Sequence, residues 1–243
     1  MFNRTELEES KRQKARLQSR DEELQHLSHE FVVASDRYNY AYQWTWLGLP
    51  VIQLPADIVA IQEIIWANKP DIIIETGIAW GGSVALYASL LQLAGKGEVV
   101  AVDINLMDHV ADQIMSLPFS ERIHLYKGSS TDPAVFKRIT SHIRPGASVM
   151  LLLDSNHTHE HVLDELRLYA PLVTKEQHLV VSDTIIEFLP PHSERKRDWG
   201  KGNNPLSAVQ AYLLESDRFQ IDEYFGQKIL TSFNPGGYLR CIR

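Results

Sequence analysis

The feature that most constrains the fold is an alternation, beginning at Pro70, of short apolar runs with segments of helical periodicity. This alternation is typical of repeated βαβ units and predicts an α/β fold, with a mainly parallel sheet and helices on both faces. The runs are rich in Val, Ile and Leu, which indicates strands buried on both faces. We expect a seven-stranded sheet, with strands at 72–75, 98–103, 122–126, 148–153, 178–182, 218–225 and 237–242, and helices near 83–94, 107–117, 133–143, 159–170 and 205–215.

The chain has 243 residues and no Pro/Gly/Ser-rich linker that divides it, so we expect one domain, at 35–243, preceded by an N-terminal helical extension at 1–34. In this extension, Leu17, Leu24, Leu27 and Phe31 are spaced as one apolar stripe of a helix. Such a stripe must be covered, either by the rest of the chain or by a second copy. A homo-oligomer formed through the N-terminal helix is therefore one of two open interpretations.

Composition excludes several classes of partner. The formal net charge is -7 and the cations are scattered, which argues against nucleic acid. No apolar run reaches the roughly 18 residues that a membrane span needs, and the first thirty residues are charged, so we expect a cytoplasmic protein. The single Cys241 excludes an intramolecular disulfide and a cysteine metal site.

A glycine-rich turn follows the strand at 72–75 and opens a helix. Glycines in such a turn can adopt positive φ and let a ligand approach bare backbone, while the first N–H groups of the helix attract an anionic group. A carboxylate at the end of the next strand, Asp103, is placed to accept both hydroxyls of a ribose. An adenosine-containing ligand is expected, bound by Glu75, Gly77, Ala79, Gly81, Ser83, Asp103 and the later turn Gly128, Ser129 and Ser130.

The spacing of the glycines selects among such ligands. A dinucleotide site requires G-x-G-x-x-G, whereas this turn reads E-x-G-x-x-x-G-x-S from Glu75 to Ser83. The second pattern is that of methyltransferases. We therefore expect S-adenosyl-L-methionine as the cofactor.

Two acidic residues follow the next strands in the same way. Asp154 ends the strand at 148–153 and Asp183 follows the strand at 178–182, so both carboxylates should reach one crevice beside the glycine turn. Paired carboxylates suit a hard cation such as Mg²⁺, which would orient an acceptor hydroxyl and lower its pKa. Asp154, Asp183 and, more weakly, Thr184 are the candidate metal ligands. The alternative is a helix cap at Asp154 and a turn residue at Asp183.

Methyl transfer to an alcohol also needs a proton acceptor. His157 lies three residues after Asp154, and imidazole is suited to neutral pH, so Asp154 and His157 are the candidate catalytic residues. His159 and His161 could instead line the start of the next helix. The long segment at 190–204 is either a lid over an anionic or sugar substrate or a surface loop, and the aromatic residues at 38–46 form either an acceptor wall or packing.

Five segments together resemble the cephalosporin hydroxylase family: WLGLPVIQLPAD at 46–57, ETGIA at 75–79, DSNHTH at 154–159, GNNP at 202–205 and NPGGYL at 234–239. Despite its name, that family has a Rossmann-like class I methyltransferase fold and includes sugar O-methyltransferases. The resemblance implies an adenosyl group over Asp103 and Gly128 to Ser130, and a metal site at the strand ends like that of catechol-type O-methyltransferases. Here Ser182 and Thr184 flank Asp183 where related sites often carry another acid or Asn.

The expected function is that of an S-adenosylmethionine-dependent O-methyltransferase, which methylates a sugar hydroxyl of a polysaccharide or glycosylated natural product with a divalent cation at the acceptor site. Two alternatives remain open. One is a non-haem iron hydroxylase using Asp154 with His157 or His159, which would leave the glycine turn without a purpose. The other is a non-catalytic subunit that binds S-adenosylmethionine.

Overall fold

The computed structural model describes residues 3–191 and 196–243, and its central element is a seven-stranded sheet with the order β5-β4-β3-β6-β7-β9-β8. Five strands are parallel, and β9 is antiparallel to both β7 and β8. The order reverses at β3, which has β4 on one side and β6 on the other. The strands are β3 (Ile72–Thr76), β4 (Glu98–Asp103), β5 (Ile123–Lys127), β6 (Val149–Leu153), β7 (His178–Val181), β8 (Phe219–Ile221) and β9 (Tyr238–Cys241).

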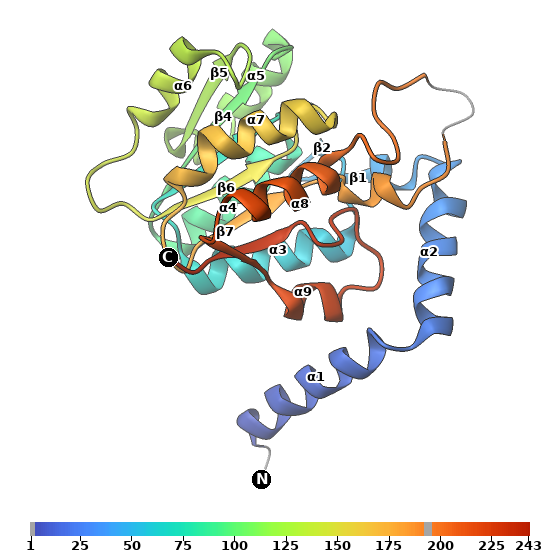
Figure 1. The fold of residues 1–243 in the computed structure, drawn as a ribbon. Helices are drawn as coiled ribbons and strands as arrows, with labels where there is room; N and C mark the ends of the chain where they lie inside the picture. Colours follow the sequence, from blue (N-terminus) through green and yellow to red (C-terminus); the bar gives the residue numbers. More distant parts are fainter. Residues whose placement is uncertain (1–2, 192–195) are drawn as a thin grey trace.

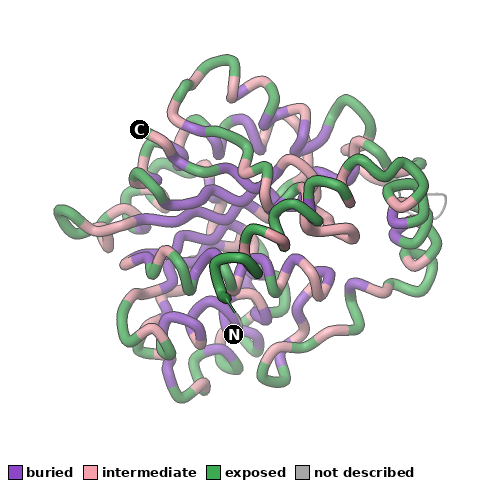
Figure 2. Tube along the Cα trace, turned by 90° about the horizontal axis from the view of Figure 1, so that it is seen from below, coloured by how far each residue is buried: buried purple, intermediate pink, exposed green. Residues whose placement is uncertain are grey.

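Helices cover both faces of this sheet, as the alternating pattern predicts (Figure 1). On one face Ile61, Leu86 and Val110 pack into the core from α3 (Pro55–Asn68), α4 (Gly82–Ala94) and α5 (Asp108–Met115). The other face is covered by α6 (Pro133–Thr140), α7 (His159–Tyr169) and α8 (Pro205–Glu215). Figure 2 shows the sheet as the buried centre of the molecule. Burial on both faces explains why the strands contain so few polar residues.

The five parallel strands confirm the sequence prediction to within one residue at each end. The predicted strand at 218–225 is wrong beyond Ile221, because the Asp222 side chain accepts the Tyr224 N–H and begins a helix, α9 (Glu223–Lys228). A two-stranded hairpin of β1 (Trp44–Trp46) and β2 (Leu49–Val51) precedes the sheet and packs against α4.

The N-terminal extension forms two helices, α1 (Arg4–Gln18) and α2 (Glu22–Asp36), with Asp21 capping the second. Figure 1 shows α1 projecting beyond the body of the molecule. Leu17, Leu27 and Phe31 are exposed to 62%, 57% and 47%, and the buried residues of α2 are Ser28 and Val32. The chain's own packing therefore leaves most of the apolar stripe open, and its cover by a second copy stays a prediction.

Within the described ranges, none of the helices combines the length and the apolar character that a membrane crossing requires.

Candidate active site

The turn between β3 and α4 is fixed by Asp103, at the end of β4. Gly77 and Gly81 have φ of +92° and +83°, and Ala79 is also left-handed, at +46°. One carboxylate oxygen of Asp103, Oδ2, accepts the N–H groups of Ile78 at 2.8 Å and Ala79 at 3.0 Å. The other oxygen, Oδ1, accepts the Asn105 N–H at 2.7 Å. A carboxylate offers about four acceptor positions, so these three hydrogen bonds still leave Asp103 able to accept from a ribose.

Glu75 lies beneath the turn rather than on the cavity wall. Its side chain is buried, and its Oε2 has no hydrogen-bond partner among the described residues. Burial raises the pKa of Glu75 to about 8, although a hydrogen bond with Ser83 acts in the opposite direction and the charge of Asp103 adds to the increase. The structure therefore gives Glu75 a place under the start of α4, beside Ser83, and its contact with a cofactor stays a prediction.

The turn after β5 lies next to Asp103, because the Gly128 N–H donates to the Asp103 carbonyl at 3.1 Å. Ser130 is buried, with its hydroxyl 3.3 Å from His161 Nε2 and its carbonyl accepting the Tyr169 hydroxyl at 2.6 Å. Contact of Gly128, Ser129 and Ser130 with an adenosyl group remains a prediction.

Beyond the ends of β6 and β7, Asp154, His157 and Asp183 come together. His157 Nε2 lies 3.2 Å from Asp183 Oδ2, and one potential ligand atom from each residue lies within 4.8 Å of the other two. Asp154 is partly exposed as a residue, but its carboxyl is enclosed. This burial raises the pKa of Asp154 well above its usual range, and the nearby carboxyl groups of Asp183, Glu75 and Glu165 raise it further.

This cluster has the electrostatics of a cation site. Within the described part of the chain, no Lys or Arg forms an ion pair with Asp154 or Asp183. Negative charge that is buried and uncompensated is costly, and a divalent cation held by two carboxylates would remove that cost. The residues present thus fit a metal such as Mg²⁺.

Three neighbouring side chains are used elsewhere in the fold. Thr184 is fully buried and its hydroxyl donates to the Pro235 carbonyl at 2.9 Å, and its role as a weak metal ligand stays a prediction. His159 Nδ1 lies 2.8 Å from the Ser207 hydroxyl of α8. The pKa of His161 is raised by its hydrogen bond with Glu165.

One cavity of about 210 Å³ joins the glycine turn to the acidic cluster. Its walls include Gly77, Ala79, Ser83 and Asp103 on the side of the turn and Asp154, His157 and Asp183 on the side of the cluster. Residues that precede the seven-stranded sheet also line it, namely Tyr42, Pro50, Val51, Ile52 and Gln53. Sequence reasoning did not single out Ile52 and Gln53 as site residues, although both lie in the segment at 46–57 that resembles the family.

The aromatic residues at 38–46, which lie before and in β1, divide between the two expected roles. Tyr42 lines the cavity, whereas Trp46 packs against the core and its indole N–H donates to Ser89 at 3.0 Å. The ring of Tyr40 packs edge to face against those of Phe31 and Trp44. Most of this group is therefore packing.

Comparison with known proteins gives one family. The family model described as rhamnosyl O-methyltransferase/CmcI matches residues 38–242. The chain is similar to the rhamnosyl O-methyltransferase of Mycobacterium tuberculosis strain H37Rv, with 31% identity over 201 residues that cover 80% of this chain and 77% of that protein. The similarity to the rhamnosyl O-methyltransferase of Mycobacterium leprae is also 31%, over 199 residues that cover 80% and 82%.

Solved structures share the fold. A CmcI structure described as containing Mg and SAM superposes with a TM-score of 0.59 at 18% identity, covering 83% of this chain and 78% of that one. The O-methyltransferase TomG from Streptomyces achromogenes, in complex with SAM, gives 0.52 at 12% identity, covering 77% and 80%. At these identities the likeness establishes the class I methyltransferase architecture.

Proposed function

Since the chain belongs to the rhamnosyl O-methyltransferase/CmcI family, we propose that it transfers a methyl group from S-adenosylmethionine to a sugar hydroxyl of a polysaccharide or glycosylated natural product. The chain is an S-adenosylmethionine-dependent O-methyltransferase. The observation that carries the proposal is the shared cavity, in which Gly77, Ala79 and Asp103 face the same space as Asp154, His157 and Asp183. A methyl donor on one wall and an acceptor on the other would lie side by side there.

The cofactor is assigned to the wall of the glycine turn. The positive-φ backbone from Gly77 to Gly81 and the start of α4 would receive the charged methionyl end, because N–H groups at a helix start attract a carboxylate. Asp103 would accept the ribose hydroxyls. The hydrogen bonds from the Ile78 and Ala79 N–H groups to Asp103 fix the position of the turn relative to the carboxylate that would accept the ribose hydroxyls.

Asp154 and Asp183 are assigned to a divalent cation, with Mg²⁺ as the metal. When bound, it would orient the acceptor hydroxyl and lower the pKa of that hydroxyl. Mg²⁺ prefers oxygen ligands and is commonly held by one or two carboxylates together with water and substrate oxygens. A third protein ligand is therefore not required, and the proposal does not depend on Thr184. The same preference for oxygen leaves the imidazole of His157 available for another role.

His157 is assigned as the proton acceptor. With Asp183 accepting from Nε2 of His157, the basic nitrogen of the ring is Nδ1. The acceptor oxygen attacks the methyl carbon, so that a C–O bond forms while the C–S bond breaks and its electron pair goes to sulfur. The hydroxyl proton passes to Nδ1 and then to water. S-adenosylhomocysteine and the methyl ether are the products.

The two alternative functions lack support. A non-haem iron hydroxylase would need a face of two histidines and one carboxylate, but His159 is directed to Ser207 and the cluster contains one histidine among the described residues. A non-catalytic subunit would not need the cavity that joins donor and acceptor walls. A cytoplasmic location remains a prediction from the sequence.

The experiment is a transfer assay with S-[methyl-¹⁴C]adenosylmethionine and a panel of acceptors, comprising rhamnose-terminated oligosaccharides, other oligosaccharides and a catechol. We expect label in a saccharide with the wild type and loss of at least 100-fold with Asp183→Asn. The matched control is Asp164→Asn, an exposed position on α7. Cofactor binding with label only in the catechol would overturn the sugar assignment.

A further inference from the structure

Two of the segments that resemble the family are bound to each other, although 44 positions separate the residues in contact. Asn203, from the segment GNNP at 202–205, accepts the His159 N–H on its side-chain oxygen Oδ1 at 2.8 Å. His159 belongs to the segment DSNHTH at 154–159 and follows His157 by two residues. The proposed function uses the second of these segments and gives no role to the first.

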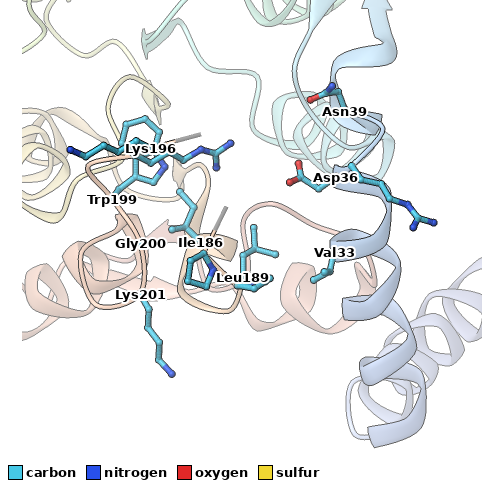
Figure 3. A pocket seen from close by; sticks show the side chains of 13 residues that line it. Val33, Asp36, Asn39, Ile186, Leu189, Lys196, Trp199, Gly200 and Lys201 are labelled. Atoms are coloured by element: carbon cyan, nitrogen blue, oxygen red, sulfur yellow. The ribbon is translucent and has the colours of Figure 1, made fainter. Parts of the chain in front are cut away.

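Asn203 also fixes the backbone on both sides of Trp199. Its side-chain Nδ2 donates to the Asp198 carbonyl at 2.8 Å, and its main chain exchanges two hydrogen bonds with that of Gly200, at 2.9 and 3.0 Å. The residue before Trp199 and the residue after it are therefore both held by one asparagine. In Figure 3, Trp199 and Gly200 lie along one turn of the chain, and the Lys201 side chain is directed away from that of Trp199.

The same loop is joined to the segment that follows Asp183. This segment, η4 (Thr184–Glu187), begins directly after Asp183. Glu187, its last residue, accepts the Gly202 N–H at 2.8 Å and the side-chain amide of the buried Asn204 at 2.5 Å. The loop that contains the tryptophan therefore has two anchors, one on the turn after β6 and one on η4.

Trp199 in turn packs against the imidazole of His157. The two rings meet edge to face, with their centroids 4.9 Å apart at 82°, which is a favourable arrangement for aromatic rings. The Arg197 guanidinium lies 5.9 Å from the centroid of the indole and restrains it further. The imidazole is also held by Asp183, whose Oδ2 lies 3.2 Å from His157 Nε2. One ring contact and one hydrogen bond thus limit the rotation of the imidazole and leave Nδ1 available.

We propose that Trp199 and Asn203 are positioning residues that act through His157. Trp199 keeps the imidazole oriented so that Nδ1 is free for the acceptor proton, and Asn203 keeps Trp199 in place. The inference rests on the proposed function and adds to it the residues that hold the proton acceptor. A displacement of about 1 Å in a reacting group can reduce turnover about 100-fold, so such a contact affects kcat although neither residue needs to touch the substrate.

Three variants test the contact. Trp199→Leu removes the ring, Trp199→Phe retains one, and Asn203→Ala releases the loop without changing the indole. Trp66→Leu is the matched control, because Trp66 is half-exposed on α3, where its ring lies against Lys69.

Three measurements are made on each variant. Turnover is followed by the transfer assay given above, and S-adenosylmethionine affinity by calorimetry. The tautomer of His157 is followed by two-bond ¹H–¹⁵N NMR at about pH 8.5, above the ordinary pKa of imidazole. The signals of His157 are assigned by their loss in His157→Ala.

We expect Trp199→Leu and Asn203→Ala to lower kcat at least tenfold, with the dissociation constant of the cofactor within twofold of wild type. The wild type, Trp199→Phe and Trp66→Leu should hold His157 as one tautomer with the proton on Nε2, whereas the other two variants should show a mixture. In a His157→Ala background, Trp199→Leu should change the residual kcat less than twofold, because residues that act through one contact are not additive.

An equal loss of kcat in the His157→Ala background overturns the proposal, as does an unaltered tautomer in both Trp199→Leu and Asn203→Ala or a wild type that is itself a mixture. If Trp199→Leu fails to fold, Asn203→Ala decides, since it leaves the indole and the imidazole in the chain. The tautomer is measured without an acceptor, so it tests the positioning role even if the wild type transfers no methyl group. That result would contradict the proposed function, and the two failures are therefore distinguishable.

Discussion

Gly77 and Asp154 lie so close together that a Cβ at position 77 would be 2.0 Å from the backbone carbonyl oxygen of Asp154. The same two segments are joined by a hydrogen bond from the Asp154 N–H to the Thr76 carbonyl at 2.8 Å. This glycine is therefore required for the junction of β3 with β6 as well as for the approach of a ligand to the turn. The glycine turn and the acidic cluster therefore meet at the backbone contact between Gly77 and Asp154.

For this reason we expect Gly77→Ala to lower the free energy of unfolding by more than about 2 kcal/mol, since it adds a steric clash to a positive φ. Gly95→Ala is the control, because Gly95 has a similar φ of +75° but nothing within 4 Å of the added Cβ. Denaturant unfolding of the two variants measures the difference. Equal losses would mean that the clash is relieved by a movement of the backbone.

Asp103→Asn should weaken S-adenosylmethionine binding about 10- to 100-fold, because a hydrogen bond to a charged acceptor contributes about 1.5–3 kcal/mol. The clamp on Ile78 and Ala79 would retain one amide oxygen, so the fold should persist. Calorimetric titration gives the affinity, with Asp112→Asn on the exposed side of α5 as control. An unchanged dissociation constant would remove Asp103 from the cofactor site.

Asp154→Asn and His157→Ala should fail in different ways if one binds the cation and the other accepts the proton. The first should raise the Mg²⁺ concentration needed for half-maximal activity by at least tenfold, because one carboxylate ligand is lost. The second should reduce kcat with the Mg²⁺ requirement unchanged and should recover activity when imidazole is added. A raised Mg²⁺ requirement in His157→Ala would instead make the histidine a ligand, and full activity of the wild type in excess chelator would exclude an essential metal.

Glu75 should make the cofactor-free protein less stable as the pH rises. The folded state holds the Glu75 proton up to about pH 8, whereas the unfolded chain loses it near 4.5, so between these values the folded state binds the extra proton. The contribution of Glu75 to the free energy of unfolding is fully present below pH 4.5 and is lost as the pH rises through 8. The total loss is on the order of 2–5 kcal/mol. Thermal unfolding of Glu75→Gln should show a flatter pH profile than wild type, and exposed Glu160→Gln should not.

The open stripe on the N-terminal helices predicts association of two or more copies. Replacing Leu17 and Leu27 by Glu together should shift the mass measured by light scattering toward the monomer, because both side chains are exposed in the single chain. Leu214→Glu is the control, at 91% exposure on the distant helix α8. If the wild type is monomeric at all concentrations, the prediction that a second copy covers the apolar stripe is wrong.

The parallel strands and their helices could be predicted because buried strands need continuous apolar runs, and each run here is bounded by polar residues. Because β4, β6 and β7 are parallel strands of one sheet, their carboxyl ends place Asp103, Asp154 and Asp183 on the same side of the molecule. The orientation of a side chain could not be predicted in this way. Whether Thr184 faces the cluster or the Pro235 carbonyl depends on how the segment before β9 returns to η4, and the sequence near Thr184 contains no sign of that contact.

The N-terminal extension shows the same limit. The stripe from Leu17 to Phe31 has helical spacing, but Asp21 caps a new helix and turns the chain, so that Ser28 and Val32 become the covered residues. Likewise, the hydrogen bond between Asn203 and His159 joins residues 44 positions apart, which no local pattern encodes.

The position of β3 between β4 and β6 has a consequence for synthesis of the chain. A growing chain that has reached about residue 130 already contains β3, the glycine turn, β4 with Asp103 and β5, whereas Asp154 and its strand β6 have yet to be made. Until β6 is inserted, one long side of β3 is an unpaired edge that other extended segments can join. Ribosome-bound chains halted between β5 and β6 should thus be the form of this protein most in need of chaperones, and the arrival of β6 closes that edge and completes the reaction centre in the same step.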